Sequence, residues 1–131
     1  MRITGQVREL KENEIFVFGS NLSGRHGKGA AKQAIKWGAK YGVGNGIQGR
    51  TYGIPTVNAT ITGKLSLKAI ASYVSEFIDY AKAHPELHFL VTAVGCGLAG
   101  WEPEDIAPLF IEATFLDNVS LPKEFWKELT R

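Results

Sequence analysis

The sequence predicts an α/β fold: a three-layer α/β/α sandwich around a mixed, largely parallel central sheet. Strand-like and helix-like patterns alternate along the chain, which is typical of βαβ units. The run at residues 87–94 is almost continuously apolar, as expected for a strand that is covered on both faces. A length of 131 residues fits one domain, and no linker or repeat divides residues 1–131.

The first half of the chain predicts a strand, a helix, a loop and a second strand. Residues 14–20 (EIFVFGS) form an apolar run that stops at glycine, which indicates a short buried strand. Small apolar residues recur at helical spacing over residues 27–40, so a helix is expected there. Glycine-rich residues 41–50 predict a loop, and residues 51–56 predict a strand.

The second half continues the alternation. A helix capped by Ser66 is expected to run to about Lys82, because its apolar residues fall on one face. The strand at residues 87–94 follows. Glu102-Pro103 starts a helix that should reach about Thr114, with acids at its positive dipole end. NVSLP predicts a last strand, and KEFWKEL predicts a short closing helix.

Composition and charge exclude several classes of protein. Hydrophobic residues make up 44% and charged residues 21% of the chain, which is ordinary for a globular protein and argues against disorder. A net charge of +2 does not favour a nucleic-acid partner. No stretch approaches the ~20 apolar residues of a membrane span, and no signal-peptide core is present. The single cysteine, Cys96, excludes an internal disulfide, so a cytoplasmic location is expected.

Two glycine-rich turns, residues 19–29 and 95–100, each follow a predicted strand. In α/β folds ligands bind beyond the carboxyl ends of the strands, where such turns gather. Glycines let the backbone approach a ligand closely, and free N–H groups attract anions. One interpretation is a ligand site between the two turns. The alternative is that these glycines only satisfy the geometry of the turns.

The charges around the first turn favour an anion. Helix starts usually carry acids, but this one carries Arg25, Lys28 and Lys32. The second turn leads into an acidic helix start, so an anion there would be held by N–H groups of the loop itself. Lys28, Lys32, Lys36 and Lys40 recur every four residues. This stripe is either a solvated face or a track for a polyanion.

Three further side chains near the turns have two interpretations each. His26 lies beside cationic residues that disfavour the imidazolium, so a neutral imidazole could act as a base; alternatively it is a surface histidine in a loop. Cys96 is either a nucleophile or, as we expect, a small side chain packed under its loop. Trp101 either forms a wall of the crevice or belongs to the core.

At these two turns the chain resembles a macro domain, the ADP-ribose-binding module. Members of that family carry a glycine-rich loop that enters a helix, and later a Gly-x-Gly turn after a central strand. ITGQVRELKENEIFVFGSNLSGRHGKGAAKQAI is similar to the first part. VTAVGCGLAGW is similar to the second, close to the branch with ADP-ribose-1''-phosphatases and the terminal ADP-ribose glycohydrolase. The whole chain also resembles small macro-like proteins of phages and prophages.

The resemblance implies a set of ligand-binding residues. Asn21 matches an asparagine that reaches the distal ribose, and residues 95–100 would wrap the diphosphate with backbone N–H groups. Gln6 stands where the family has an aspartate that accepts from the adenine amine, and glutamine can pair with an adenine edge. The full expected set is Gln6, Gly19, Ser20, Asn21, Gly27, Gly29, Gly95, Cys96, Gly97, Leu98, Ala99, Gly100 and Trp101.

The chain departs from the family at its catalytic positions. Ala99 stands where the glycohydrolase branch has its catalytic aspartate, and Val57 and Asn58 lie near the place of its nucleophilic lysine. Some phosphatase-type members use a first-loop histidine, so the resemblance implies His26 and Asn21 as catalytic residues here.

The expected function is therefore binding of ADP-ribose or a related NAD-derived nucleotide, with hydrolysis of a 1''-phosphate or an ADP-ribosyl ester. The alternative is a non-catalytic reader of ADP-ribosylated protein, or a sponge for an NAD-derived signalling nucleotide. A third interpretation is a phosphate-binding α/β domain outside the family. No metal or other cofactor is expected, and no membrane partner.

Overall fold

The computed structural model describes all 131 residues, Met1–Arg131, and confirms the predicted fold class. The strands are β1 (Ile3–Thr4), β2 (Glu14–Asn21), β3 (Gly46–Gln48), β4 (Thr51–Val57), β5 (His88–Val91) and β6 (Val119–Pro122). They form one six-stranded sheet in the order β1-β6-β5-β2-β4-β3. All neighbouring strands are parallel except β3 and β4, which are antiparallel.

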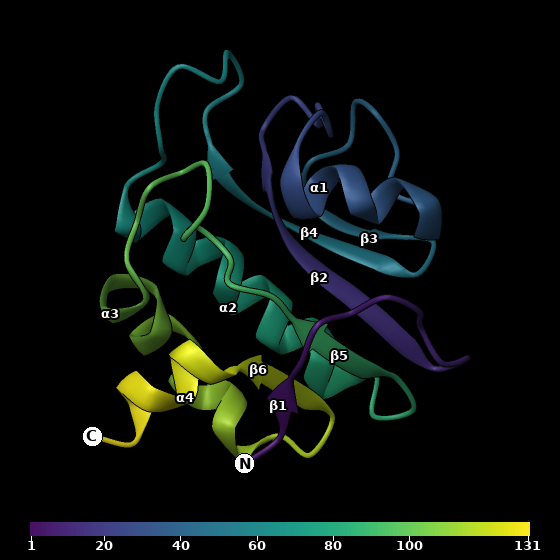
Figure 1. The fold of residues 1–131 in the computed structure, drawn as a ribbon, viewed down its shortest axis with the longest axis vertical. Coiled ribbons are helices and arrows are strands. Elements are labelled where there is room, and N and C mark those ends of the chain that lie inside the picture. Colours follow the sequence, from purple (N-terminus) through teal and green to yellow (C-terminus); the bar gives the residue numbers. More distant parts are fainter.

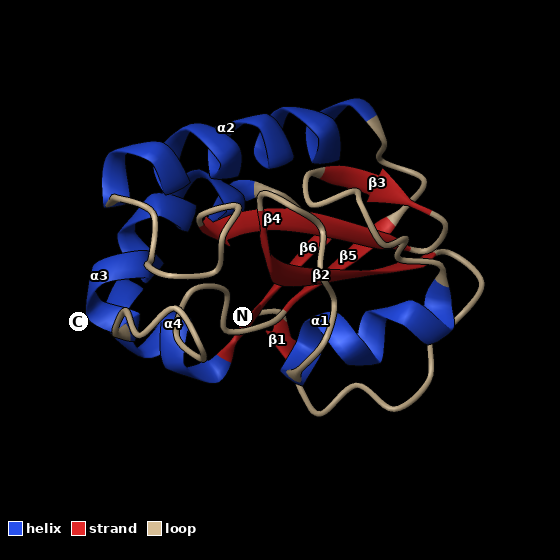
Figure 2. Cartoon of the chain, turned by 90° about the horizontal axis from the view of Figure 1, so that it is seen from above, coloured by secondary structure: helices blue, strands red, loops and turns tan.

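Helices cover both faces of this sheet. They are α1 (Gly29–Ala34), α2 (Leu67–Ala83), α3 (Pro103–Ile106) and α4 (Lys123–Leu129), with 3-10 helices at Ile35–Trp37 and Ala107–Phe115. Figure 2 shows α2 on one side of the sheet and α1 on the other, so the molecule is a three-layer α/β/α sandwich. No helix is both long enough and apolar enough to cross a membrane.

The alternating side chains of β2 supply both cores. Ile15 and Val17 belong to the larger core, which also takes in α2, α4 and the 3-10 helix Ala107–Phe115. Phe16 and Phe18 point to the opposite face and pack with alanines of α1 in a smaller core. A central strand buried on both faces is the reason for its continuous apolar sequence.

The second predicted helix is confirmed as α2. The Ser66 hydroxyl accepts a hydrogen bond from the Ala69 N–H at 3.1 Å, as expected of an N-cap. Its buried residues fall on one face, facing the sheet: Ile70, Val74, Phe77, Ile78 and Ala81. The helix ends at Ala83, one residue beyond the predicted limit.

The first predicted helix is shorter than expected from residues 27–40. The α-helix covers only Gly29–Ala34, and the 3-10 helix Ile35–Trp37 follows it. Lys28 occupies the N-cap position and makes no side-chain capping bond, and Gly38 has φ of 112°, which ends the helical segment. The predicted stripe of four lysines is broken as a result, because a regular α-helix does not span them.

Two other elements, β5 and α3, end earlier than predicted, and two strands, β1 and β3, were not predicted. β5 stops at Val91, three residues before the predicted end, and the next residue, Thr92, donates both its N–H and its hydroxyl to the Val17 carbonyl, at 3.1 and 2.8 Å. The helix that starts at Pro103 becomes 3-10 from Ala107, next to Pro108, which lacks an N–H. The loop at residues 41–50 contains β3, and the N-terminus forms β1 beside β6 (Figure 1).

Candidate functional site

The two glycine-rich turns meet at the carboxyl end of the parallel strands, as predicted. Gly19 lies near the end of β2, and Gly95 lies in the loop that follows β5. A Cβ atom on Gly19 would stand 3.3 Å from the Gly95 nitrogen, so only glycine allows the two backbones this approach without displacement. Gly95 itself has φ of 79° and faces the Ile106 side chain. Backbone packing therefore fixes how the two loops lie.

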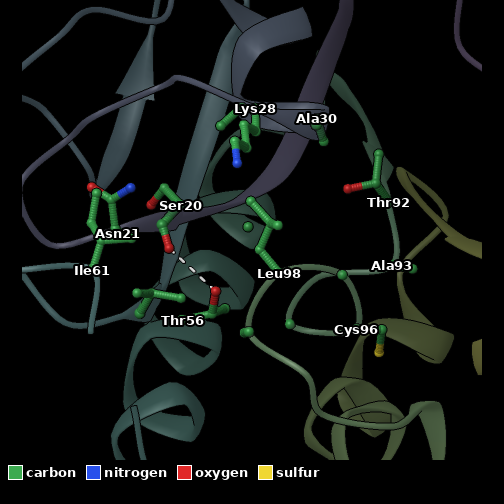
Figure 3. A pocket seen from close by; sticks show the side chains of 17 residues that line it. Ser20, Asn21, Lys28, Ala30, Thr56, Ile61, Thr92, Ala93, Cys96 and Leu98 are labelled. Atoms are coloured by element: carbon green, nitrogen blue, oxygen red, sulfur yellow. Dashed lines mark hydrogen bonds between the residues drawn. The ribbon is translucent and has the colours of Figure 1, made fainter. Parts of the chain in front are cut away.

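Between these loops lies a cavity of about 500 Å³, which we name the main cleft (Figure 3). Its lining consists of residues 19–21, 28–31, 56–57, 61, 92–93 and 95–99. The predicted site residues that it brings together are Gly19, Ser20, Asn21, Gly29, Gly95, Cys96, Gly97, Leu98 and Ala99. A volume of this size falls within the usual range for small-molecule sites.

The main cleft offers donors and positive charge. Lys28 lines it, its amine makes no hydrogen bond or ion pair to another residue, and Figure 3 shows this amine extending into the space above Leu98. The backbone N–H groups of Gly97, Leu98 and Ala99 donate no hydrogen bond within the protein. Unpaired N–H groups in a glycine-rich loop beside a free cation form a concavity suited to an anion.

Asn21 holds the first loop in shape. Its carboxamide oxygen accepts from the Arg25 N–H and the Ser23 hydroxyl, both at 2.9 Å, and its nitrogen donates to the Arg25 carbonyl at 2.8 Å. The side chain is buried at the edge of the main cleft. Its amide nitrogen carries two protons and donates one to Arg25, so the other remains for a ligand. The neighbouring Ser20 hydroxyl donates to the Gly44 carbonyl, which ties the loop to a distant segment.

Two apolar side chains stand at the rim of the main cleft. Leu98 is 76% exposed, and Ile61 is 45% exposed. Ile61 has φ of 58°, a left-handed conformation that is a rare outlier for a β-branched residue. Asn58 holds it there: its carbonyl accepts from the Ile61 N–H, and its side chain accepts from the Thr62 N–H. Strain of this kind is concentrated at functional sites in proteins.

His26 does not lie in the main cleft, contrary to the prediction. Its side chain is 0% exposed, and its ring packs against Phe18 and Tyr41 at centroid distances of 5.4 and 5.7 Å. Its Nε2 donates to the Lys40 carbonyl at 2.9 Å, and its Nδ1 has no partner. The ring fills the space behind the first loop, and His26 joins that loop to residues 40–41.

Other predicted ligand-binding residues also lie outside the main cleft. Trp101 packs at the edge of the larger core, where its Nε1 donates to the Leu65 carbonyl and the Lys64 amine stands 3.7 Å from its ring centroid. Trp101 is thus partly buried against the core and does not line the main cleft. Gly27 and Gly100 belong to the two loops but do not line the cleft, and Gln6 lies in a neighbouring hollow.

Cys96 has the packing role that we expected. Its Sγ lies 3.6 Å from the Val94 carbonyl, and Figure 3 shows it turned away from Lys28 and Leu98. Burial, helped by the nearby Glu102 carboxylate, raises the pKa of the thiol to about 11. At neutral pH the group is a thiol, which is a poor nucleophile.

Two smaller hollows adjoin the main cleft at Thr92. The Arg8 hollow, of about 380 Å³, is lined by residues 5–8, 16, 30, 33, 36 and 92. The Thr4 hollow, of about 350 Å³, is lined by residues 4–6, 92–93, 122 and 124. Thr92 lines all three spaces, so they lie next to one another at the carboxyl edge of the sheet.

Several lining residues were not predicted from the sequence. Thr56 and Thr92 are polar residues at the ends of apolar strand segments, and that change of polarity is the signal that could have indicated them. The Thr56 hydroxyl donates to the Ser20 carbonyl at 3.2 Å and thereby links β4 to β2 at the cleft floor. Ile61 lies in a loop without any distinctive pattern, so nothing local marks it.

Comparisons with known proteins support the fold alone. No protein-family model matches the chain, and no curated protein matches it. One solved structure, that of a protein of unknown function from Bacteroides thetaiotaomicron, is similar with a TM-score of 0.61. The two sequences are 16% identical, and the match covers 88% of this chain and 90% of that chain. The α/β architecture is thus shared by a protein of different sequence.

Proposed function

We propose that this protein binds ADP-ribose or a related NAD-derived nucleotide in the main cleft. The observation that carries the proposal is the meeting of two glycine-rich loops around a space with a free cation and unpaired N–H groups. A diphosphate over Gly97, Leu98 and Ala99 would accept hydrogen bonds from these N–H groups, and Lys28 would neutralise part of its charge. The resemblance of the two loops to those of macro domains favours ADP-ribose among diphosphates.

The two hollows next to the main cleft support a ligand larger than a phosphate. The distal ribose would occupy the main cleft, next to Asn21 and Ile61, and the adenosine would extend past Thr92. Gln6 lines both smaller hollows, so it is placed beside the base in this arrangement. The Thr4 hydroxyl is buried without a hydrogen-bond partner at the same place, and a base edge would satisfy it.

We favour binding without catalysis over hydrolysis. The titratable side chains that line the main cleft are Lys28 and Cys96. Lys28 is proposed to bind the diphosphate, and burial raises the pKa of the Cys96 thiol to about 11, so neither is assigned to activate water. His26, the expected general base, is buried behind the first loop. A reader of ADP-ribosylated protein or a sponge for an NAD-derived nucleotide needs none of these groups. Because a chain with a single cysteine has no internal disulfide, we infer that the protein acts in the reducing cytoplasm.

Calorimetric titration tests the proposal. ADP-ribose should bind the wild-type chain, and Lys28→Gln should weaken binding about tenfold because one charge-assisted contact is lost. Lys68→Gln is the matched control, since Lys68 lies on α2, across the sheet from the first loop. Binding that is absent at millimolar ADP-ribose would overturn the proposal. Binding of free phosphate as tight as that of ADP-ribose would instead favour a general phosphate-binding domain.

Hydrolysis is tested separately with ADP-ribose-1''-phosphate and with ADP-ribosylated protein. If the protein is a reader or a sponge, neither substrate turns over, although ADP-ribose still binds. Turnover by the wild-type chain that is retained in His26→Gln would point to a hydrolase without a histidine base. Turnover that is lost in a stably folded His26→Gln would restore the mechanism expected from the sequence.

A further inference from the structure

We propose that the ligand carries an additional phosphate on the ribose of its nucleoside, and that Arg8 and Lys36 bind this phosphate in the Arg8 hollow. The inference rests on the proposed function, because it concerns the part of the same ligand that extends past Thr92. It names a narrower class of ligand: nucleoside diphosphates with a phosphomonoester at the 2' or the 3' position.

The number of spaces around Thr92 matches the number of substituents on such a ribose. Three neighbouring spaces of about 500, 380 and 350 Å³ all have Thr92 in their lining. A ribose that is substituted with a base, a 5'-diphosphate and a further phosphate also has three branches. Thr92 is held rigidly at the junction, because its hydroxyl donates to the Val17 carbonyl at 2.8 Å. A ribose placed against Thr92 could send one substituent into each space.

The two smaller hollows differ in charge. The Arg8 hollow is lined by two cations, Arg8 and Lys36, and by no carboxylate. The Thr4 hollow is lined by the Glu124 carboxylate and by no cation. A phosphate is therefore attracted to the Arg8 hollow and repelled from the Thr4 hollow. The base, which can donate an amino group to Glu124 or Thr4, is assigned to the Thr4 hollow.

Both cations of the Arg8 hollow are held by hydrogen bonds but are not neutralised by a carboxylate. The Lys36 amine donates to the Arg8 carbonyl at 3.0 Å and lies 4.5 Å from the Trp37 ring centroid. The Arg8 guanidinium donates to the Gln6 side chain at 3.3 Å. Neither cation forms an ion pair, since the ion pairs of the molecule join Lys82 to Glu112 and Arg131 to Glu128. Two like charges beside one hollow repel each other until an anion enters.

The position of Lys36 follows from the interrupted helix. Because the α-helix stops at Ala34 and a 3-10 turn follows, Lys36 is directed to the N-terminal segment rather than continuing the lysine stripe. The Gln33 side chain donates to the Val7 carbonyl at 2.5 Å and fixes the same segment to α1. The hollow is thus built between two tethered parts of the chain.

The test compares ligands with and without the extra phosphate by calorimetry on the full chain. The pairs are ADP-ribose with 2'-phospho-ADP-ribose, and ADP with adenosine 3'-phosphate 5'-diphosphate. At least one phosphorylated form should bind about tenfold or more tightly than its parent, and raised salt should reduce this preference. The pair that shows the preference identifies the 2' or the 3' position as the source of the phosphate.

The double variant Arg8→Gln/Lys36→Gln should remove the preference, so that parent and phosphorylated ligands bind it with similar affinity. Lys68→Gln/Lys82→Gln removes the same charge from α2, on the opposite side of the sheet, and should keep the preference. Equal affinity for parent and phosphorylated ligands in the wild-type chain would overturn the inference, while the proposed function would stand. Loss of the preference in the α2 variant would also overturn it, because the effect would then come from net charge. If no nucleotide binds, the proposed function itself fails.

Discussion

At the scale of single residues, the close approach of Gly19 to Gly95 decides whether the main cleft exists. A Cβ on Gly19 would meet the Gly95 nitrogen at 3.3 Å and the Thr56 hydroxyl at 3.5 Å. The first neighbour is backbone of the other loop, so relief of the contact requires the two loops to separate by a few tenths of an ångström. The unpaired N–H groups would then be displaced from the anion that they are proposed to bind.

Gly19→Ala should therefore weaken ADP-ribose binding more than it lowers stability. We expect about tenfold weaker binding and at most about 1–3 kcal/mol lower unfolding free energy, from overpacking of a tight contact. Gly27→Ala is the matched control, because a Cβ on Gly27 meets nothing within 4 Å and its φ is not positive. Unchanged affinity in a folded Gly19→Ala protein would show that the approach of the loops is unimportant for the ligand.

His26 illustrates a residue whose importance is structural. Its ring fills the space between Phe18 and Tyr41, and its Nε2 donates to the Lys40 carbonyl. His26→Ala should lower the unfolding free energy by about 2–4 kcal/mol, because it leaves a cavity and an unpaired carbonyl. Urea unfolding measures this change. Tyr41→Phe is a milder companion variant, since it removes only the hydroxyl that donates to the His26 carbonyl at 3.3 Å. A His26→Ala protein of wild-type stability would contradict the buried placement.

The thiol of Cys96 gives a prediction on pH. Burial raises its pKa from the ordinary 9.0 to about 11, so the folded state binds this proton more tightly than the unfolded state. The stability from this group is present in full below pH 9 and is lost as pH rises from about 9 to 11. Iodoacetamide should alkylate the folded protein slowly at pH 8, with a rate that rises toward pH 11. Rapid alkylation at pH 8 of the folded chain, as fast as in urea, would refute the raised pKa.

At the scale of elements, α2 depends on its cap. Ser66→Ala removes the acceptor of the Ala69 N–H and should lower the unfolding free energy by about 1 kcal/mol. Ser72→Ala, at an exposed position inside the same helix, should leave stability equal or slightly higher, because alanine is the better helix former. Urea unfolding of the two variants distinguishes the loss of the cap from the change in helix propensity. Equal effects of both substitutions would contradict the assigned cap.

How well each element can be predicted depends on how far apart in the sequence its interacting residues lie. The α2 helix and β2 have patterns that extend over several turns or strand residues, and both were predicted closely. β1 has two residues and exists through its pairing with β6, more than a hundred residues away, which no local pattern reveals. The first helix was overpredicted because alanine spacing favours a helix, whereas Gly38 and the uncapped start limit it.

The same distinction applies to the candidate site. Two turns after parallel strands must lie at the same edge of a sheet, so the meeting of Gly19 with Gly95 could be predicted. The burial of His26 could not, because it depends on Tyr41, which follows the helix and returns to the first loop. The hollows beside Gln6 form only when the N-terminal segment crosses the sheet edge, and the sequence does not encode that path in any short motif.

At the scale of the whole molecule, the sheet order places three loops at one edge. β5, β2 and β4 are neighbours and run parallel, so the segments that follow them converge there (Figure 1). Each loop contributes something different. The loop after β2 contributes Lys28, and the loop after β4 contributes Ile61. The loop after β5 contributes its unpaired N–H groups. A ligand that contacts all three would couple segments that are far apart in the sequence, and would therefore stabilise the fold as a whole.

Amide NMR spectroscopy of the ¹⁵N-labelled chain during titration with ADP-ribose tests the central claim most directly. We predict saturable shifts of the Gly97, Leu98 and Ala99 amide signals, because these unpaired N–H groups are proposed to donate to the diphosphate. Signals of α2, on the opposite side of the sheet, should move little. The absence of saturable shifts in the loop, or shifts confined to other parts of the chain, would contradict the account.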